Sequence, residues 1–157
     1  MKGSYVLLIH LAEARTITVG RLGDIHFPRG HYAYVGSAMG GFGSRLNHHL
    51  RRTGRPHWHI DYLRDKASVT GVILYESEQR NECSIAQAFD GQLDCIPGFG
   101  ASDCRCRSHL FLSLDESQLK RVTMAIPDRL TLPMDLKPEE IHRFLPPAEV
   151  TGGLHLS

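Results

Sequence analysis

Long apolar runs are missing from this sequence of 157 residues. The longest, from Tyr5 to Ala12, is interrupted by His10 and falls far short of the roughly 18 residues that a membrane-spanning helix needs. The N-terminal residues lead straight into this segment without a signal-peptide cleavage site. We therefore expect neither a membrane span nor secretion, and we predict a cytoplasmic protein.

Cysteine is scarce as well, with four residues in the chain. Because we expect no secretion, these cysteines are predicted to be reduced thiols or metal ligands rather than a disulfide framework. A strong net charge is also absent: the chain carries +1, and 41% of its residues are hydrophobic, which excludes an intrinsically disordered protein. The length fits a single hydrophobic core.

Acidic residues are absent from the segment between Ile25 and Ile60. The same segment contains five arginines and six of the ten histidines of the chain. The planar guanidinium group of arginine binds phosphate and carboxylate groups through two parallel hydrogen bonds. A codon preference for arginine would explain the choice of Arg over Lys, but it would not separate the charges along the chain. The sequence thus predicts an anionic ligand on one face of the protein.

Short aliphatic and β-branched segments alternate irregularly with helical patterns, which predicts the α+β class with a small, mainly antiparallel β-sheet flanked by helices. We expect Thr16–Val19 to form a hairpin with the strand at Tyr5–Leu11, and Leu110–Leu112 to be the last strand. Ser44 is the predicted N-cap of a helix that ends near residue 52. Further strands are expected at 25–27, 31–35 and 69–75, and helices at 56–65, 82–89, 115–124 and 138–145.

Several short motifs occur in a characteristic order along the chain. They are Gly3-Ser4-Tyr5, Tyr34-Val35-Gly36, Arg45-Leu46-Asn47-His48-His49 and a glutamate, Glu82, at the start of a later predicted helix. In this order they resemble the GIY-YIG nuclease superfamily. Two longer stretches, at residues 56–62 and 98–106, resemble its small Uri-type endonuclease branch.

The resemblance covers roughly residues 3 to 112. It implies a GIY-YIG nuclease-like domain at residues 1–112. The predicted helices that follow would form an extension at 113–157 packed on this domain, with about the last ten residues loosely held.

The resemblance also implies a catalytic site that hydrolyses phosphodiester bonds in DNA, made of Tyr5, Tyr34, Arg45, His49 and Glu82. Tyr34 would act as the general base and Arg45 would stabilise charge on the phosphate. His49 would assist proton transfer, and Tyr5 would position the water or the phosphate. Glu82 would hold one Mg²⁺ or Mn²⁺ ion. We expect the five side chains to line one concave surface.

The basic segment supplies candidate contacts to the DNA backbone. The residues predicted to bind nucleic acid are Arg51, Arg52, Arg55, His57 and His59. The arginines would contact phosphate groups on or near one helix. The two histidines, which flank Trp58, would contact phosphate or stack on a base.

A separate motif, Cys104-Arg105-Cys106 followed by His109, offers soft ligands of the kind that bind Zn²⁺. Cys95, His57 or His59 would complete a tetrahedral site. The alternative needs no metal: the two cysteines would point to opposite sides of a tight loop, and His109 would bond to the backbone.

Other functions remain open on the sequence alone. The tyrosines could be ordinary core residues, Arg45 and His49 could lie on a solvated helix face, and Glu82 could serve the helix dipole. The chain has Ser37-Ala38 where the superfamily often has a lysine, and its two tyrosine motifs are widely spaced. These departures favour a nucleic-acid-binding module without turnover. A third alternative is a metal-holding protein with no role in nucleic acid binding. No obligate protein partner is predicted.

Overall fold

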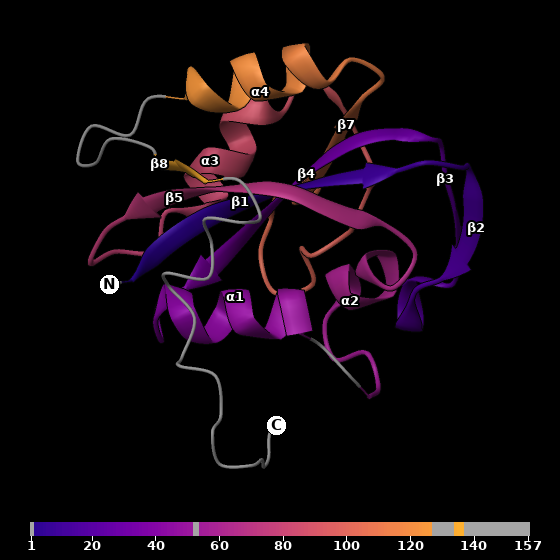
Figure 1. The fold of residues 1–157 in the computed structure, drawn as a ribbon, viewed down its shortest axis with the longest axis horizontal. Coiled ribbons are helices and arrows are strands. Elements are labelled where there is room, and N and C mark those ends of the chain that lie inside the picture. The colour runs from indigo at the N-terminus through magenta and orange to yellow at the C-terminus, as the bar shows by residue number, and fades with distance from the viewer. Residues whose placement is uncertain (1, 52–53, 127–133, 137–157) are drawn as a thin grey trace.

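The computed structural model of the chain describes residues 2–51, 54–126 and 134–136 (Figure 1). The strands are β1 (Gly3–Leu11), β2 (Arg15–Thr18), β3 (Asp24–Phe27), β4 (Gly30–Ala38), β5 (Ser68–Glu76), β6 (Asp94–Cys95), β7 (Leu110–Ser113) and β8 (Met134–Leu136). The α-helices are α1 (Phe42–Arg51), α2 (His59–Arg64), α3 (Glu82–Phe89) and α4 (Glu116–Met124), and a 3₁₀ turn spans Gly20–Leu22.

The main sheet has the strand order β6-β7-β4-β1-β5-β8, and each neighbouring pair is antiparallel. Strands β2 and β3 form a separate two-stranded ribbon. The protein is therefore of the α+β class, with an antiparallel sheet and four helices in the described residues. β1 lies between β4 and β5 at the centre of the sheet.

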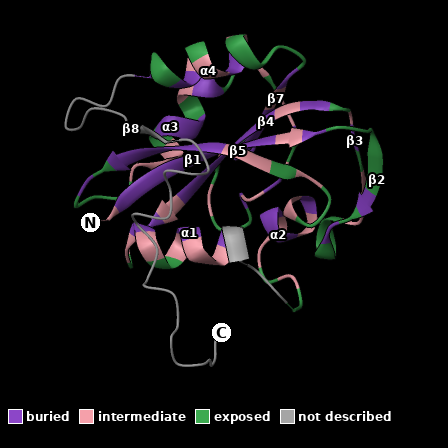
Figure 2. Ribbon diagram, viewed as in Figure 1, coloured by how far each residue is buried: buried purple, intermediate pink, exposed green. Residues whose placement is uncertain are grey.

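Helices cover both faces of the sheet, and α1 and α2 lie on the opposite side from α3 and α4 (Figure 1). Because successive side chains of a strand point to opposite faces, Tyr5 and Leu7 of β1 pack with the core under α1 and α2. Val6 and Leu8 pack with the core under α3 and α4. β1 is consequently buried along almost its whole length (Figure 2).

The predicted hairpin between Thr16–Val19 and the first strand is wrong. β1 pairs instead with the nine-residue strands β4 and β5, one on each side, so β2 has no free edge of β1 to join. β2 pairs with β3, and Ile17 faces Ile25 in that ribbon. The longer apolar strands occupy the centre of the sheet because each of them buries side chains on both faces.

The first helix also begins earlier than its predicted cap. Ser44 is exposed and lies inside α1, which starts at Phe42. Phe42 is buried, so the packing of its ring anchors the first turn where a serine cap was expected.

The chain beyond residue 112 adds to the same core. Leu119 of α4 packs on the sheet with Phe111 and Phe89, and Asp115 caps α4 by accepting a hydrogen bond from the Ser117 N–H. β8 pairs with β5, so Leu110–Leu112 is not the last strand. The predicted helix at 138–145 and the chain end lie outside the described residues. Within the described part of the chain, no helix has the length and apolarity to cross a membrane.

Candidate active site and metal centre

A cleft of about 500 Å³ opens beside β4. The pairing of β4 with β7 ends at Tyr34, and beyond this point residues from both sides of the sheet reach the same space. The lining residues come from β4 and the turn after it, from α1, from the residues at and just before the starts of α2 and α3, and from the segment before β7. They include Tyr34, Arg45, Trp58, Arg80, Glu82, Cys83, Asp103, Cys104 and His109.

Three of the five predicted catalytic residues line this cleft. Tyr34 comes from β4, Arg45 from α1 and Glu82 from the first turn of α3. The guanidinium carbon of Arg45 lies 4.2 Å from the centroid of the Trp58 ring, a cation–π contact that fixes the charge over the cleft. One carboxylate oxygen of Glu82, Oε2, is buried and has no hydrogen-bond partner among the described residues. Its other oxygen lies 3.9 Å from Nη1 of Arg80.

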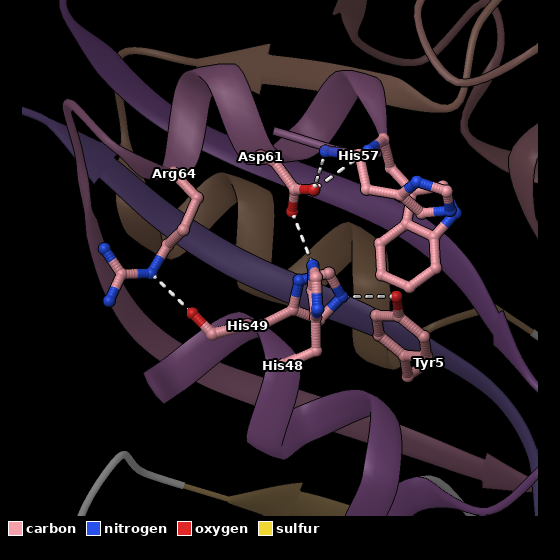
Figure 3. Close-up of polar contacts among 7 residues, drawn as sticks. Tyr5, His48, His49, His57, Asp61 and Arg64 are labelled. Atoms are coloured by element: carbon pink, nitrogen blue, oxygen red, sulfur yellow. Dashed lines mark hydrogen bonds and ion pairs between the residues drawn. The ribbon is translucent and has the colours of Figure 1, made fainter. Parts of the chain in front are cut away.

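The remaining two predicted catalytic residues lie behind the cleft rather than in its wall. Tyr5 and His49 are fully buried, and the Tyr5 hydroxyl lies 2.6 Å from Nε2 of His49 (Figure 3). The Tyr5 ring crosses over Gly36, its partner in the β1–β4 pairing. The expectation that all five side chains line one surface is therefore wrong for Tyr5 and His49. Tyr5 and Tyr34 lie on the same face of the sheet, but Tyr5 is on the central strand β1 and its hydroxyl is covered by His49 of α1, whereas Tyr34 borders the cleft.

Burial controls the protonation of this group. It raises the pKa of Tyr34 to about 12, although the charge of Arg45 opposes part of the rise. Burial also raises the pKa of Tyr5 well above its ordinary value, and it lowers the pKa of His49 to about 3. At neutral pH both tyrosines keep their protons and His49 is uncharged, so the bond between Tyr5 and His49 joins two neutral groups.

A buried carboxylate holds the start of α2 against α1. Asp61 accepts hydrogen bonds from the backbone N–H groups of His57 and Trp58, at 2.7 and 2.8 Å, and its other oxygen lies 2.9 Å from Nε2 of His48 (Figure 3). Burial by itself would raise the pKa of Asp61, but these bonds hold it below the ordinary value. Trp58 is thereby placed under Arg45.

The structure describes only part of the predicted nucleic-acid-binding set. Arg52 lies outside the described residues, and so does the side chain of Arg51. Arg55 and His57 are exposed. His59 has a different surrounding from the one expected: its Nδ1 accepts a hydrogen bond from the Gly100 N–H at 2.8 Å, and its ring packs on Phe99.

Four metal-binding side chains meet at one end of the cleft. The ligand atoms of Cys83, Cys104, Cys106 and His109 all lie within 4.8 Å of one another. Nε2 of His109 is 3.5 Å from Sγ of Cys104 and 3.9 Å from Sγ of Cys83. These four residues, which we call the cysteine cluster, could hold a metal such as zinc.

The geometry of the cysteine cluster suits a tetrahedral ion. Sulfur and nitrogen ligands at ordinary zinc distances lie about 3.6 Å apart around a tetrahedral ion, close to the separations here. Nδ1 of His109 lies 3.2 Å from the Val35 carbonyl oxygen. A carbonyl can only accept, so Nδ1 carries the proton and Nε2 is left with its lone pair facing the sulfurs.

The sequence predicted three members of the cysteine cluster but missed Cys83. None of the residues proposed as the fourth ligand belongs to the cluster: Cys95, His57 and His59 lie elsewhere. Spacing gives no hint of Cys83, which is on a helix well before the Cys104 motif. The one feature of the sequence that pointed to Cys83 is its position directly after Glu82, which the resemblance assigned to the catalytic site.

A larger hollow of about 680 Å³ lies beside β6 and β7. Cys95 and Arg107 are among its lining residues. None of the residues predicted to be catalytic lines it, so the smaller cleft remains the candidate active site.

Comparison with known proteins identifies a family. No curated protein and no solved structure matches the chain. A family model matches residues 4–131, and its family is described as a domain of unknown function, DUF123. The match includes β4, α1 and α3 together with the whole cysteine cluster. This chain therefore belongs to the DUF123 family.

Proposed function

We propose that this protein is a metal-dependent endonuclease that hydrolyses phosphodiester bonds in DNA with a site of the GIY-YIG type. The observation that supports the proposal is the meeting of Tyr34, Arg45 and Glu82 in one cleft. The three residues come from separate elements on both sides of the sheet. They combine a hydroxyl, a permanent positive charge and a carboxylate, which are groups that phosphodiester hydrolysis uses.

Arg45 binds the scissile phosphate. Its guanidinium group pairs with non-bridging oxygens and stabilises the charge that grows on them during attack by water. The contact with Trp58 limits the freedom of the side chain, so less entropy is lost when the phosphate binds.

Glu82 is the residue that would hold Mg²⁺. The buried and unpartnered Oε2 is a hard oxygen donor of the kind that Mg²⁺ prefers, so the residue present fits the ion. When bound, Mg²⁺ supplies positive charge to the phosphate and the leaving oxygen. Glu82 itself sets the position of that charge relative to Arg45.

Tyr34 contacts the attacking water. The proton that the water loses on attack goes to the phenolate form of Tyr34, which is rare because the pKa is about 12 and which the Arg45 charge favours. Tyr5 and His49 act as positioning residues. Their side chains, joined by the hydrogen bond between them, fill the space behind Tyr34 and Gly36.

DNA is the proposed partner because the cleft borders the segment from Ile25 to Ile60, which has no acidic residue. For the cysteine cluster we propose Zn²⁺, since thiolate and imidazole ligands favour this ion over Mg²⁺. The two sites would thus take ions of different chemistry.

The test compares two glutamates that both occupy the first turn of a helix. Glu82→Gln should lower Mg²⁺-dependent cleavage of DNA by about 10²-fold or more, as expected for the loss of a metal ligand. Glu116→Gln, at the start of α4, removes the same charge from a helix N-terminus and should cleave like the wild type. DNA binding should be retained by both. Tyr34→Phe and Arg45→Ala should also lose about 10²-fold in cleavage.

Duplex, branched and single-stranded substrates need to be assayed with and without Mg²⁺. Salt-sensitive binding without cleavage of any of these substrates would contradict the nuclease and support a nucleic-acid-binding module without turnover. If the protein neither binds nor cleaves DNA, both of these functions are excluded and a metal-holding protein is the alternative that is left. Equal cleavage by Glu82→Gln and the wild type would contradict the role of this carboxylate.

A further inference from the structure

The segment between β6 and β7, residues 96–109, forms one wall of the cleft and contains no helix or strand. We call it the cleft loop. It lies against Tyr34: the ring centroids of Phe99 and Tyr34 are 6.3 Å apart. A Cβ on Gly100 would lie 3.1 Å from Cε1 of Tyr34. The position of the cleft loop therefore decides how the Tyr34 hydroxyl meets the cleft.

The cysteine cluster joins the cleft loop to α3. Three of its members, Cys104, Cys106 and His109, belong to the cleft loop, and the fourth, Cys83, is the second residue of α3. Cys83 directly follows Glu82, so any bond that fixes Cys83 also fixes the backbone of Glu82. A further link between the two segments, the ion pair of Arg107 with Asp90, is exposed and sits past the other end of α3, where it gives little hold.

The donor set indicates a structural ion. Four protein ligands fill a tetrahedral zinc site and leave no open position for water or substrate. His109 is oriented by its bond to the Val35 carbonyl, as is usual for a histidine ligand. The two limbs of the cleft loop are joined to each other by backbone hydrogen bonds, from the Gly98 N–H to the Arg107 carbonyl and from the His109 N–H to the Phe99 carbonyl, both at 2.8 Å. An ion at the cysteine cluster would add a link from the cleft loop to α3, which these bonds do not provide.

We infer that the cysteine cluster binds one structural Zn²⁺ that fastens the cleft loop to the first turn of α3 through Cys83, and thereby holds Tyr34 and Glu82 in register across the cleft. The site itself is independent of the nuclease activity, whereas its role in setting the cleft rests on the proposed function. Loss of zinc loosens both walls of the cleft and leaves the sheet in place.

Metal content tests the ligands. Protein purified without added metal should contain about one zinc per chain by elemental analysis. Cys83→Ser and Cys106→Ser should each lower that content at least severalfold. Cys95→Ser is the matched control, because Cys95 is also a half-buried free cysteine but lies outside the cysteine cluster. It should keep its zinc.

Cobalt substitution gives a second measurement on the wild-type protein, which avoids variants that fail to fold. After chelation and addition of Co²⁺, thiolate-to-cobalt charge-transfer bands and the strong visible bands of tetrahedral Co²⁺ should appear, and Zn²⁺ should displace them. Cys95→Ser should show the same bands. Protein that contains no zinc and shows no such bands would overturn the inference, and so would Cys83→Ser protein with full zinc content.

Amide hydrogen exchange tests the role of the ion without relying on activity. Removal of zinc from the wild type should speed exchange at least tenfold in the cleft loop and at the start of α3, and leave β1 unchanged. Re-addition of zinc should restore protection. Unchanged exchange in the cleft loop would overturn the fastening role.

Cleavage is measured on the same samples. A wild-type protein that binds zinc and shows the exchange effect but never cleaves DNA would refute the proposed function and support the fastening role. A zinc-free protein that cleaves at the wild-type rate would overturn the role of zinc in setting the cleft while supporting the nuclease.

Discussion

Gly36 has no side chain because the ring of Tyr5 occupies the space that a Cβ would need. A Cβ built at Gly36 would lie 2.3 Å from Cζ of Tyr5, which is fully buried and has no room to withdraw. Gly36→Ala should therefore lower the free energy of unfolding by about 1–3 kcal/mol, as overpacking does. Urea denaturation measures this change.

Gly40→Ala is the matched control for that substitution. No atom of the described residues lies within 4 Å of a Cβ at Gly40, and the residue is exposed. Its unfolding free energy should stay within about 0.5 kcal/mol of the wild type. Equal stability of the two variants would show that the packing of the Tyr5 ring does not require a glycine at position 36.

Buried His49 makes stability depend on pH. Burial lowers its pKa from 6.5 to about 3, so the unfolded chain takes up a proton that the folded protein refuses between these values. This contribution to stability is complete above pH 6.5 and is lost as the pH falls toward 3, by about 1.4 kcal/mol per pH unit. His49→Gln should show a correspondingly shallower dependence in chemical denaturation between pH 6.5 and 4. Equal slopes would mean that His49 is charged in the folded protein.

At the scale of the elements, Asp61 connects α2 to α1. Asp61→Ala leaves two backbone N–H groups at the start of α2 without their acceptor and removes the partner of His48. The free energy of unfolding should fall by about 1–3 kcal/mol or more. Trp58 is the only tryptophan of the chain, so its fluorescence reports the same loss directly.

Asp65→Ala provides the comparison for Asp61→Ala, because Asp65 is an exposed aspartate at the end of the same helix. Its effect on stability and on Trp58 fluorescence should be much smaller. A similar loss in both variants would mean that the helix needs negative charge in general rather than the buried contacts of Asp61.

The elements themselves could largely be predicted from local patterns. Alternating or continuous apolar residues marked β1, β4, β5 and β7, and the residues that α3 buries, Ile85, Ala86 and Phe89, follow the spacing of one helix face. The partner of β2 was not predictable in this way, because strand pairing depends on which edges remain free after the longer strands have paired. The start of α1 depended likewise on the burial of Phe42.

For the molecule as a whole, the segregated charge predicts the strength of DNA binding in salt. Arg45, Arg51, Arg52 and Arg55 would provide roughly 3–5 phosphate contacts, which corresponds to a log–log salt slope of about −3 to −4.5 on duplex DNA. Binding titrations over a range of salt concentrations measure this slope. A slope near zero would exclude nucleic acid as the partner.

The double variant Arg51→Ala/Arg52→Ala separates binding from catalysis. It should weaken DNA binding and reduce the log–log salt slope by the amount expected for about two phosphate contacts. Cleavage at saturating DNA should be largely retained. An unchanged slope would show that these two arginines do not contact the phosphate backbone.

The sequence by itself determined the α+β class and most of the elements, because hydrophobic periodicity and turn residues act over a few neighbouring positions. It also marked Tyr34, Arg45 and Glu82 as candidates, through residue type and order. Only the tertiary structure decided that Tyr5 and His49 are buried behind the cleft and that Cys83 completes the cysteine cluster. Such contacts join residues far apart in the chain, and they arise from the packing of helices on both faces of one sheet, which no local pattern encodes.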